Sequence, residues 1–208
     1  MRKKILFYVL VPFLIFTLNG CALILQKGRR SDMEKIESLE KELAELRRTR
    51  GVLEQRLAQE IENDQVSVRM GKRGLVITFV AEVLFDSGKA KLRDQAKFTL
   101  EKIAGILGEE VPENHIAVEG HTDNVPIKHS RWKSNWELSA HRALSVLSFL
   151  ESVGIDSSKL SATGYGEFQP VGSNDDAGGK QLNRRVEIII VPNSTYATQT
   201  DLDVEDLK

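Results

Sequence analysis

Residues 120–142 read GHTDNVPIKHSRWKSNWELSAHR, and this stretch joins a buried strand to an amphipathic helix. Apolar residues alternate along 116–120, and the alternation stops at the polar run HTDN at 121–124. Because Asp and Asn side chains bond to their own backbone and favour turns, the chain is predicted to leave a sheet at this point. Residues 134–137 (SNWE) have the form of a capping box, which predicts that a helix begins after Ser134.

Arg142 does not fit this helix as an ordinary surface charge. Leu138 and Val146 lie one helical turn to either side of it, so its guanidinium extends along a partly apolar stripe. A guanidinium in such surroundings requires an anion, supplied either by the protein or by a ligand. Asp123, at the end of the strand, is the nearest candidate by topology. A structural ion pair and a binding site both satisfy the requirement, and structural pairs are the commoner of the two.

The other apolar patterns predict a strand–helix–strand–helix–strand–strand order. Two alternating runs around the turn GKRG predict a hairpin at 66–79. The remaining elements are expected as a helix at 92–107, a strand at 116–120, the helix after Ser134, and strands at 160–165 and 186–191. This order predicts an α+β domain with a mixed β-sheet and helices packed on one face (β-α-β-α-β-β).

Five motifs occur along the chain in a fixed order: VLFDSGKAKL, GHTDN, NWELSAHRALSVLSFL, ATGYGEFQP and NRRVEIIIV. Together they resemble the OmpA-like C-terminal domain shared by OmpA-type porins, peptidoglycan-associated lipoproteins and MotB-type stator proteins. The resemblance covers residues 65–193. In such domains the ligand is the peptide stem of peptidoglycan, which is held at its diaminopimelate residue.

The resemblance implies a role for each residue of the site. The free end of diaminopimelate carries an ammonium and a carboxylate on one carbon, so Asp123 is expected to hold the ammonium. Arg142 is expected to hold the carboxylate in bidentate fashion, as its planar fork of donors allows. Other residues are expected to shape the pocket or line its rim: Thr122, Asn135, Leu138, Phe85, Asp86 and Arg185. The site is predicted to bind without catalysis, cofactor or metal.

Residues 31–63 form a charged segment with a heptad pattern. Its heptad positions alternate steps of three and four, with Arg50 at one of them and apolar residues at the others: Ile36, Leu39, Leu43, Leu46, Leu53 and Leu57. This spacing favours a coiled coil that joins copies of the chain, and a single solvated helix is the alternative. About 30 helical residues would reach on the order of 45 Å and could act as a spacer.

The N-terminus has the pattern of a lipoprotein export signal. Residues 1–20 place three basic residues before an apolar run, and Leu18-Asn19-Gly20-Cys21 resembles a lipobox. Cys21 is therefore the expected lipidation site, 21–30 a tether, and the outer membrane the expected location. An uncleaved membrane span over 5–25 is the alternative. The polar, acidic segment 194–208 is predicted to be a disordered tail.

Net charge and motif spacing argue against several other classes of function. The formal net charge is −1, and loss of the three N-terminal basic residues would leave −4, which argues against nucleic acid as a partner. The four histidines lack the paired spacing of zinc modules. A triad of Ser139, His121 and Asp123 lacks the G-x-S-x-G elbow. Trp132 and Trp136 are candidate lid aromatics, although Trp136 is expected to pack in the core.

These observations predict a lipid-anchored envelope protein, facing the periplasm, that ties the outer membrane to peptidoglycan without a covalent bond. A stator-like or secretion-associated cell-wall anchor, engaging other envelope proteins, is the alternative within the class of binding proteins. A peptidoglycan hydrolase is the alternative from the class of enzymes.

Overall fold

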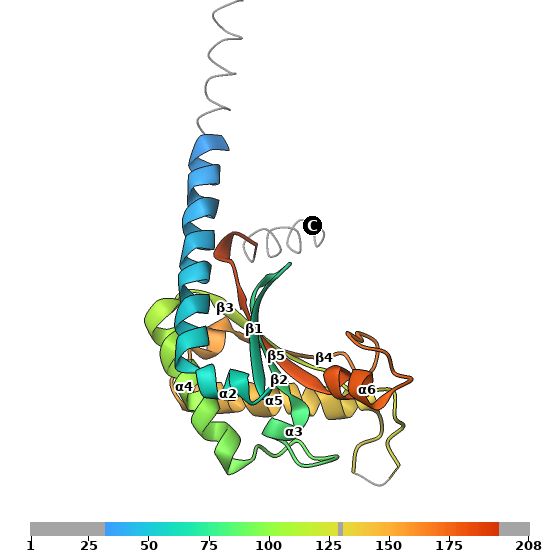
Figure 1. Cartoon of the computed structure of the whole chain (residues 1–208). Coiled ribbons are helices and arrows are strands. Elements are labelled where there is room, and N and C mark those ends of the chain that lie inside the picture. The colour runs from blue at the N-terminus through green and yellow to red at the C-terminus, as the bar shows by residue number, and fades with distance from the viewer. Residues whose placement is uncertain (1–31, 129–130, 196–208) are drawn as a thin grey trace, which may run out of the picture. The chain divides into compact units, whose positions relative to one another are not determined.

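The computed structural model describes residues 32–128 and 131–195 (Figure 1). Contacts divide the chain into two compact units, Met1–Glu42 and Leu43–Lys208. Four predicted features lie outside the described residues: the signal peptide, the lipidation site Cys21, the tether, and the tail from 196 onward. In the described part of the chain, no helix has both the length and the apolar character needed to cross a bilayer.

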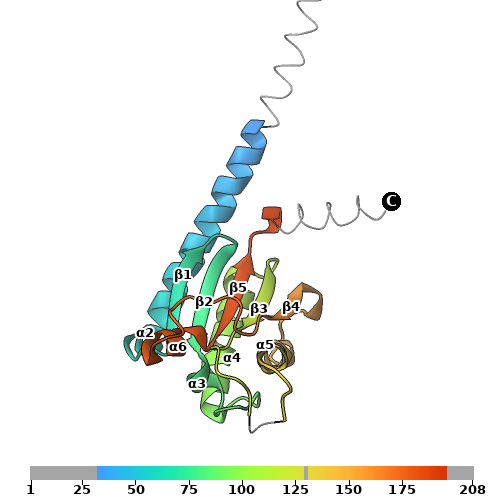
Figure 2. The ribbon, with the colours of Figure 1, turned by 90° about the vertical axis from the view of Figure 1, so that its right-hand side faces the viewer.

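A five-stranded mixed sheet forms the centre of the second unit. Its strands are β1 (Val66–Gly71), β2 (Gly74–Val80), β3 (His115–Gly120), β4 (Leu160–Gly164) and β5 (Arg185–Val191). The order across the sheet is β1-β2-β5-β3-β4, which Figure 2 shows from left to right. Only β3 and β4 pair in parallel, and the other three pairings are antiparallel. The central position of β5 explains its nearly continuous apolar sequence.

Two long helices, α4 (Asp94–Glu110) and α5 (Asn135–Ser152), pack on one face of the sheet (Figures 1 and 2). Their buried residues join those of the strands in one core, which includes Leu100, Ile103, Leu107, Val146, Leu150, Ile77, Phe79, Val118, Val186, Ile188 and Ile190. The shorter helices are α2 (Ala58–Glu62), α3 (Ala81–Leu84) and α6 (Ala177–Asn183), with a 3-10 turn η1 (Ser157–Lys159). The predicted α+β class is confirmed.

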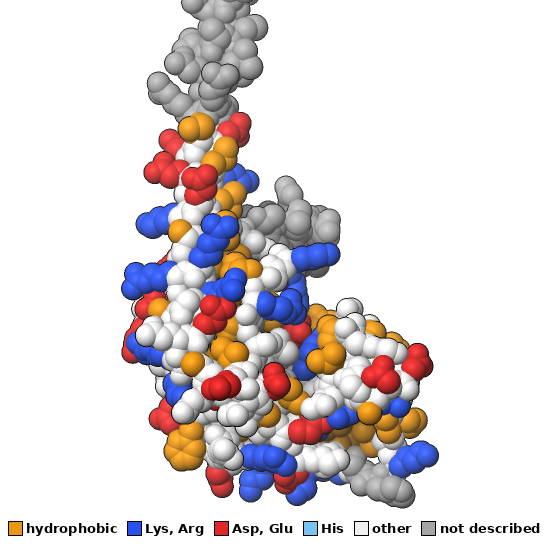
Figure 3. Space-filling view, viewed as in Figure 1, with side chains coloured by type: hydrophobic (Ala, Val, Ile, Leu, Met, Phe, Trp, Pro, Cys, Tyr) orange, Lys and Arg blue, Asp and Glu red, His pale blue; other side chains and the backbone are white. Residues whose placement is uncertain are grey.

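The heptad stripe, which runs along the helix at 32–56 and ends at Leu57 just beyond it, divides into two parts. Leu46, Leu53 and Leu57 are at most 2% exposed and belong to the core of the second unit. Ile36 and Leu39 are 51% and 41% exposed, and apolar side chains alternate with charged ones along this helix (Figure 3). The second compact unit begins at Leu43, and the helix that precedes the predicted 65–193 domain contributes to its core.

The start of α5 is fixed by its cap. The Ser134 hydroxyl accepts a hydrogen bond of 3.3 Å from the backbone N–H of Glu137. The Glu137 carboxylate in turn accepts from the backbone N–H of Lys133. The predicted capping box is therefore present, with the glutamate reaching one residue further back than expected, and it sets the point where the site loop becomes helix.

Two glycines let α5 rest directly on the strand ends. A Cβ atom on Gly120 would overlap the carbonyl oxygen of Ser139, and one on Gly164 would overlap the backbone nitrogen of Ala140. Because neither position carries a side chain, the helix backbone approaches β3 and β4 closely. This approach places the first turns of α5 beside the loop that follows β3.

Gly120→Ala is expected to lower the free energy of unfolding by about 1–3 kcal/mol, because the added methyl group forces α5 away from β3. Gly105→Ala is the matched control, since Gly105 lies in α4 with nothing within 4 Å of an added Cβ. That alanine should be neutral or stabilising by up to about 1 kcal/mol. Urea unfolding measures both variants, and equal stabilities would contradict the constraint.

Candidate functional site

A cavity of about 590 Å³ lies between the loop after β3, the loop after α3 and the start of α5. Its lining residues are Glu82, Phe85, Ser87, Gly88, Thr122, Asp123, Val125, Pro126, Ile127, Lys128, Asn135, Leu138, Arg142 and Arg184. Six of the eight residues expected at the ligand site are in this set. Asp86 and Arg185 are not in this set. Glu82 and Arg184 line the cavity although the sequence did not predict them as site residues.

Arg142 reaches the cavity from the second turn of α5. It is 5% exposed, its Nε donates a 3.0 Å hydrogen bond to the carbonyl oxygen of Lys89, and its Cζ lies 5.3 Å from the centroid of the Phe85 ring. Burial lowers the pKa of Arg142 to about 10, so the group still carries its charge at neutral pH. Among the described carboxylates none forms a salt bridge with it, so the cavity holds a buried cation without a paired anion.

Asp123 pairs with a different arginine. Its Oδ2 accepts a 2.8 Å bond from Nη1 of Arg184, and its Oδ1 accepts a 3.1 Å bond from the backbone N–H of Val125. The Nε of Arg184 also binds the carboxylate of Glu82. The ion pair between Asp123 and Arg142 that sequence reasoning considered is therefore not formed. The cavity instead holds two carboxylates and two guanidiniums, with Arg142 as the member that lacks a salt bridge.

The alternation of β5 explains why Arg184 lines the cavity and Arg185 does not. Val186, Ile188 and Ile190 face the helices, so position 184 has the parity of the helix-covered face and position 185 that of the other face. Arg185 is buried, donates a 2.8 Å bond to Glu187 and a 3.2 Å bond to the carbonyl oxygen of Gln169. This parity is the sequence signal that could have identified Arg184.

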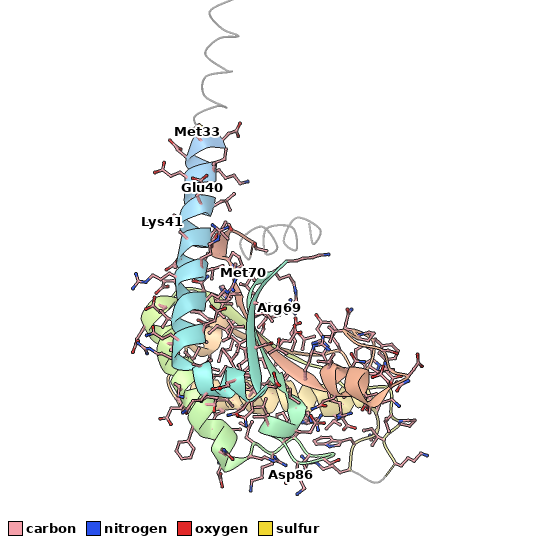
Figure 4. The ribbon with its side chains drawn as sticks, viewed as in Figure 1. Met33, Glu40, Lys41, Arg69, Met70 and Asp86 are labelled. Carbon is pink, nitrogen blue, oxygen red and sulfur yellow. The ribbon has the colours of Figure 1, made fainter. Side chains whose placement is uncertain are left out.

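Asp86 holds the loop that follows α3. Its carboxylate accepts 3.0 Å bonds from Lys89 and from Arg93, and Figure 4 shows it at the outer edge of that loop. The hydrogen bond from Lys89, followed by that from Arg93, lowers the pKa of Asp86. The loop continues to Lys89, whose carbonyl oxygen accepts from Arg142. Asp86 thus acts on the cavity through loop geometry.

Hydrogen bonds tie the cavity loops together. The Nδ2 atom of Asn135 lies within bonding distance of the carbonyl oxygens of Asp123 (3.3 Å) and Val125 (3.1 Å) and of Oε2 of Glu167 (2.7 Å). Trp132 is 7% exposed, and its indole N–H donates a 2.8 Å bond to the carbonyl oxygen of Gly88. These bonds prepare a rigid polar wall, which lowers the cost of ordering the site when a ligand binds.

A second polar cluster lies on the face of the sheet that bears Arg185. Ligand-type atoms of Glu119, His121 and Glu187 lie within 4.8 Å of one another, as they would around a metal ion. Arginines already bind the carboxylates: Arg73 binds Glu119, while Arg185 and Arg69 bind Glu187. Figure 4 shows Arg69 on β1. Three guanidiniums against two carboxylates repel a dication, so this cluster is a salt-bridge network.

His121 is the uncharged member of this network. It is 3% exposed and stacks on Tyr165 with 5.2 Å between ring centroids, and neither ring nitrogen has a hydrogen-bond partner among the described residues. Ser139 instead bonds to the backbone of Trp136 and Gly166, so the imagined triad is not assembled. Burial, with the charge of Arg185 as a lesser cause, lowers the pKa of His121 from 6.5 to about 4.

This pKa shift predicts a pH-dependent stability. The unfolded chain binds a proton at His121 below pH 6.5 and the folded chain only near pH 4, so stability should fall as the pH drops through that window. The loss should approach about 3 kcal/mol below pH 4. His121→Phe keeps an aromatic ring and should remove this part of the slope in urea unfolding between pH 7 and 4. An unchanged slope would contradict the assignment.

Comparisons with known proteins identify the family of this chain. The OmpA family matches residues 84–184, a segment that contains most of the cavity. Motility protein B of Bacillus subtilis (strain 168) is 42% identical over 135 residues, which cover 64% of this chain and 51% of that protein. Probable lipoprotein YiaD of Escherichia coli (strain K12) is 35% identical over 141 residues, which cover 68% of this chain and 62% of that protein.

A solved structure supports the same relationship. The cell wall anchor of the T6SS from Pseudomonas aeruginosa aligns with a TM-score of 0.62 and 35% identity, covering 68% of this chain and 97% of that one. Residues 84–184 form an OmpA family domain, as the motifs predicted. It spans about half the length of the curated motility proteins that it matches.

Proposed function

We propose that this protein binds peptidoglycan non-covalently by holding the diaminopimelate end of a peptide stem in the cavity between α5 and the loop after β3. The observation that carries this proposal is Arg142, a buried guanidinium without a salt bridge to any described carboxylate. A buried charge without a partner is costly, and a ligand carboxylate would offset that cost.

The charges of the cavity suit a zwitterionic ligand. The carboxylate of diaminopimelate would lie against the fork of Arg142, and its ammonium against the carboxylate of Asp123, which is 7% exposed. Phe85 and Leu138 offer apolar contacts for the methylene groups between the two ends of the ligand. Thr122 and Asn135 hold the loop backbone around it, as Asn135 does through the carbonyl oxygen of Asp123.

The proposal assigns binding and no catalysis to this cavity. Of the residues once considered for a triad, Ser139 is bonded to backbone atoms and His121 lies on the other face of the sheet. The related proteins carry the names motility protein, lipoprotein and cell wall anchor. A hydrolase would release soluble fragments from purified sacculi, and we expect sedimentation of the protein with sacculi without such release.

We further propose that the chain works as an anchor in the cell envelope. Lipidation at Cys21 would attach it to the outer membrane with the domain in the periplasm, in line with the name of its relative YiaD. Loss of fatty-acid labelling in Cys21→Ser tests this attachment. Similarity to a motility protein and to a T6SS cell wall anchor supports the alternative, in which the N-terminal part engages another envelope complex.

The role of Arg142 predicts a specific pattern of binding losses. Arg142→Lys keeps the charge but loses the planar fork, so it should weaken binding to diaminopimelate-type sacculi nearly as much as Arg142→Ala. The expected loss is about 2–5 kcal/mol, because the ligand carboxylate is left without its partner. Arg56→Lys is the matched control, since Arg56 forms an exposed pair with Glu109.

Two further measurements separate binding from structure. Sacculi with lysine at the same stem position lack the second carboxylate, so the native protein should bind them poorly. Asp123→Ala should weaken binding to the diaminopimelate type, because the ligand ammonium loses its acceptor. Melting temperatures are measured on the same variants. Lower melting temperatures with unchanged sacculus binding would show that Arg142 and Asp123 serve the fold alone.

The exposed end of the helical stripe supports a proposal of self-association. Ile36, Leu39 and Leu43 are 40–51% exposed at heptad spacing, and a second copy of the chain could cover them. Fragment 31–195 should sediment as an oligomer, and replacement of Ile36, Leu39 and Leu43 by serine should make it monomeric. Leu46→Ser is the control, because it should lower the melting temperature without changing the mass. A monomeric native fragment would contradict the proposal.

A further inference from the structure

Two aromatic side chains form an exposed pair at the N-terminal end of α5. Trp136 is 49% exposed and Phe168, in the loop between β4 and α6, is 59% exposed. Their rings stack with 5.0 Å between centroids and 22° between planes. The expectation that Trp136 packs in the core is therefore wrong: the loop after β4 supplies one ring to cover one of its faces, and half of the side chain stays in water.

The loop that carries Phe168 is fastened to the lining of the cavity. The backbone N–H of Thr122 donates a 2.9 Å bond to the carbonyl oxygen of Gly166, and Asn135 donates a 2.7 Å bond to Glu167. Thr122 and Asn135 both line the cavity. The residues that precede Phe168 are thus bonded to two residues of the cavity wall, and Trp136 follows one of them, Asn135, in α5.

We propose that Trp136 and Phe168 form a second subsite that stacks against a sugar ring of the glycan strand whose peptide occupies the cavity; this inference rests on the proposed function. Aromatic rings carry negative charge on their faces. The C–H groups on one face of a pyranose ring carry the complementary partial charge and form a flat apolar surface. An exposed, rigid aromatic pair matches such a surface in shape and polarity.

Trp136 and Arg142 leave α5 in different directions. Trp136 precedes Arg142 by six residues, which is about 9 Å along the helix axis and about 120° around it. Diaminopimelate is the third residue from the sugar, and three extended residues span about 10 Å. A stem held at Arg142 would reach Trp136 by passing Asn135, which lines the cavity, precedes Trp136 in α5 and bonds Glu167 of the loop that carries Phe168. Two rings are far too small a surface for a stable contact between protein chains, which bury on the order of 800 Å² per partner.

Calorimetry with two probes tests the subsite: the bare tripeptide that ends in diaminopimelate, and the same tripeptide attached to its N-acetylglucosamine–N-acetylmuramic acid disaccharide. The native protein should bind the disaccharide form roughly tenfold more tightly. Trp136→Ala and Phe168→Ala should lose this gain and keep the affinity for the bare tripeptide. Phe98→Ala is the matched control, since Phe98 is 72% exposed on α4 and lines none of the cavity.

A second readout uses the unaltered chain. Trp136 is the exposed one of the two tryptophans and Trp132 is buried, so acrylamide quenches mainly Trp136. The disaccharide form should protect this emission from quenching more than the bare tripeptide does. Equal affinities of the native protein for both probes, or a gain that both variants keep, overturns the subsite alone. Failure of the native protein to bind either probe overturns the proposed function together with the subsite.

Discussion

The burial of Arg142 without a carboxylate partner is the constraint on which the site depends. A guanidinium removed from water loses much of its solvation, and the lowered pKa of Arg142 reflects that loss. The protein offers it one backbone carbonyl, that of Lys89, and the face of the Phe85 ring. These contacts hold its position but do not neutralise its charge. The surrounding core must therefore be stable enough to carry the cost, which the close packing of α5 on the sheet provides.

The sheet separates two sets of charges that are adjacent in sequence. Arg184 lies at the cavity and bridges Asp123 and Glu82, whereas Arg185 turns to the opposite face and binds Glu187. If Arg184 also faced away, Asp123 would lose its partner and would be free to neutralise Arg142. Arg184, which directly precedes β5, instead pairs with both carboxylates of the cavity, Asp123 and Glu82. On the proposed function, this arrangement leaves the guanidinium of Arg142 to bind a carboxylate of the ligand.

Sequence reasoning identified the strand end, the helix cap and the residues nearest to Asp123 and Arg142, because local turn chemistry and helical periodicity determine them. Arg185 rather than Arg184 was predicted at the site, because only the register of β5 distinguishes the two adjacent arginines. It also assigned Leu46, Leu53 and Leu57 to a coiled coil, yet they pack in the domain core. A spacing of three and four residues is common to both kinds of helix, and the choice depends on whether a partner surface lies nearby.

The position of the domain boundary changes the mechanical consequence of the proposed anchor. Because the second compact unit begins at Leu43, and Leu46 and Leu53 of the same helix lie in its core, the helix from that point to 56 belongs to the domain and does not act as a spacer. On the proposed attachment at Cys21, only residues 22–42 connect lipid to domain. That segment spans about 30 Å as a helix and at most about 70 Å fully extended. A helix of this length falls short of the 45 Å expected from about 30 helical residues, so on this attachment a domain held 45 Å from the membrane requires residues 22–42 to be more extended than a helix.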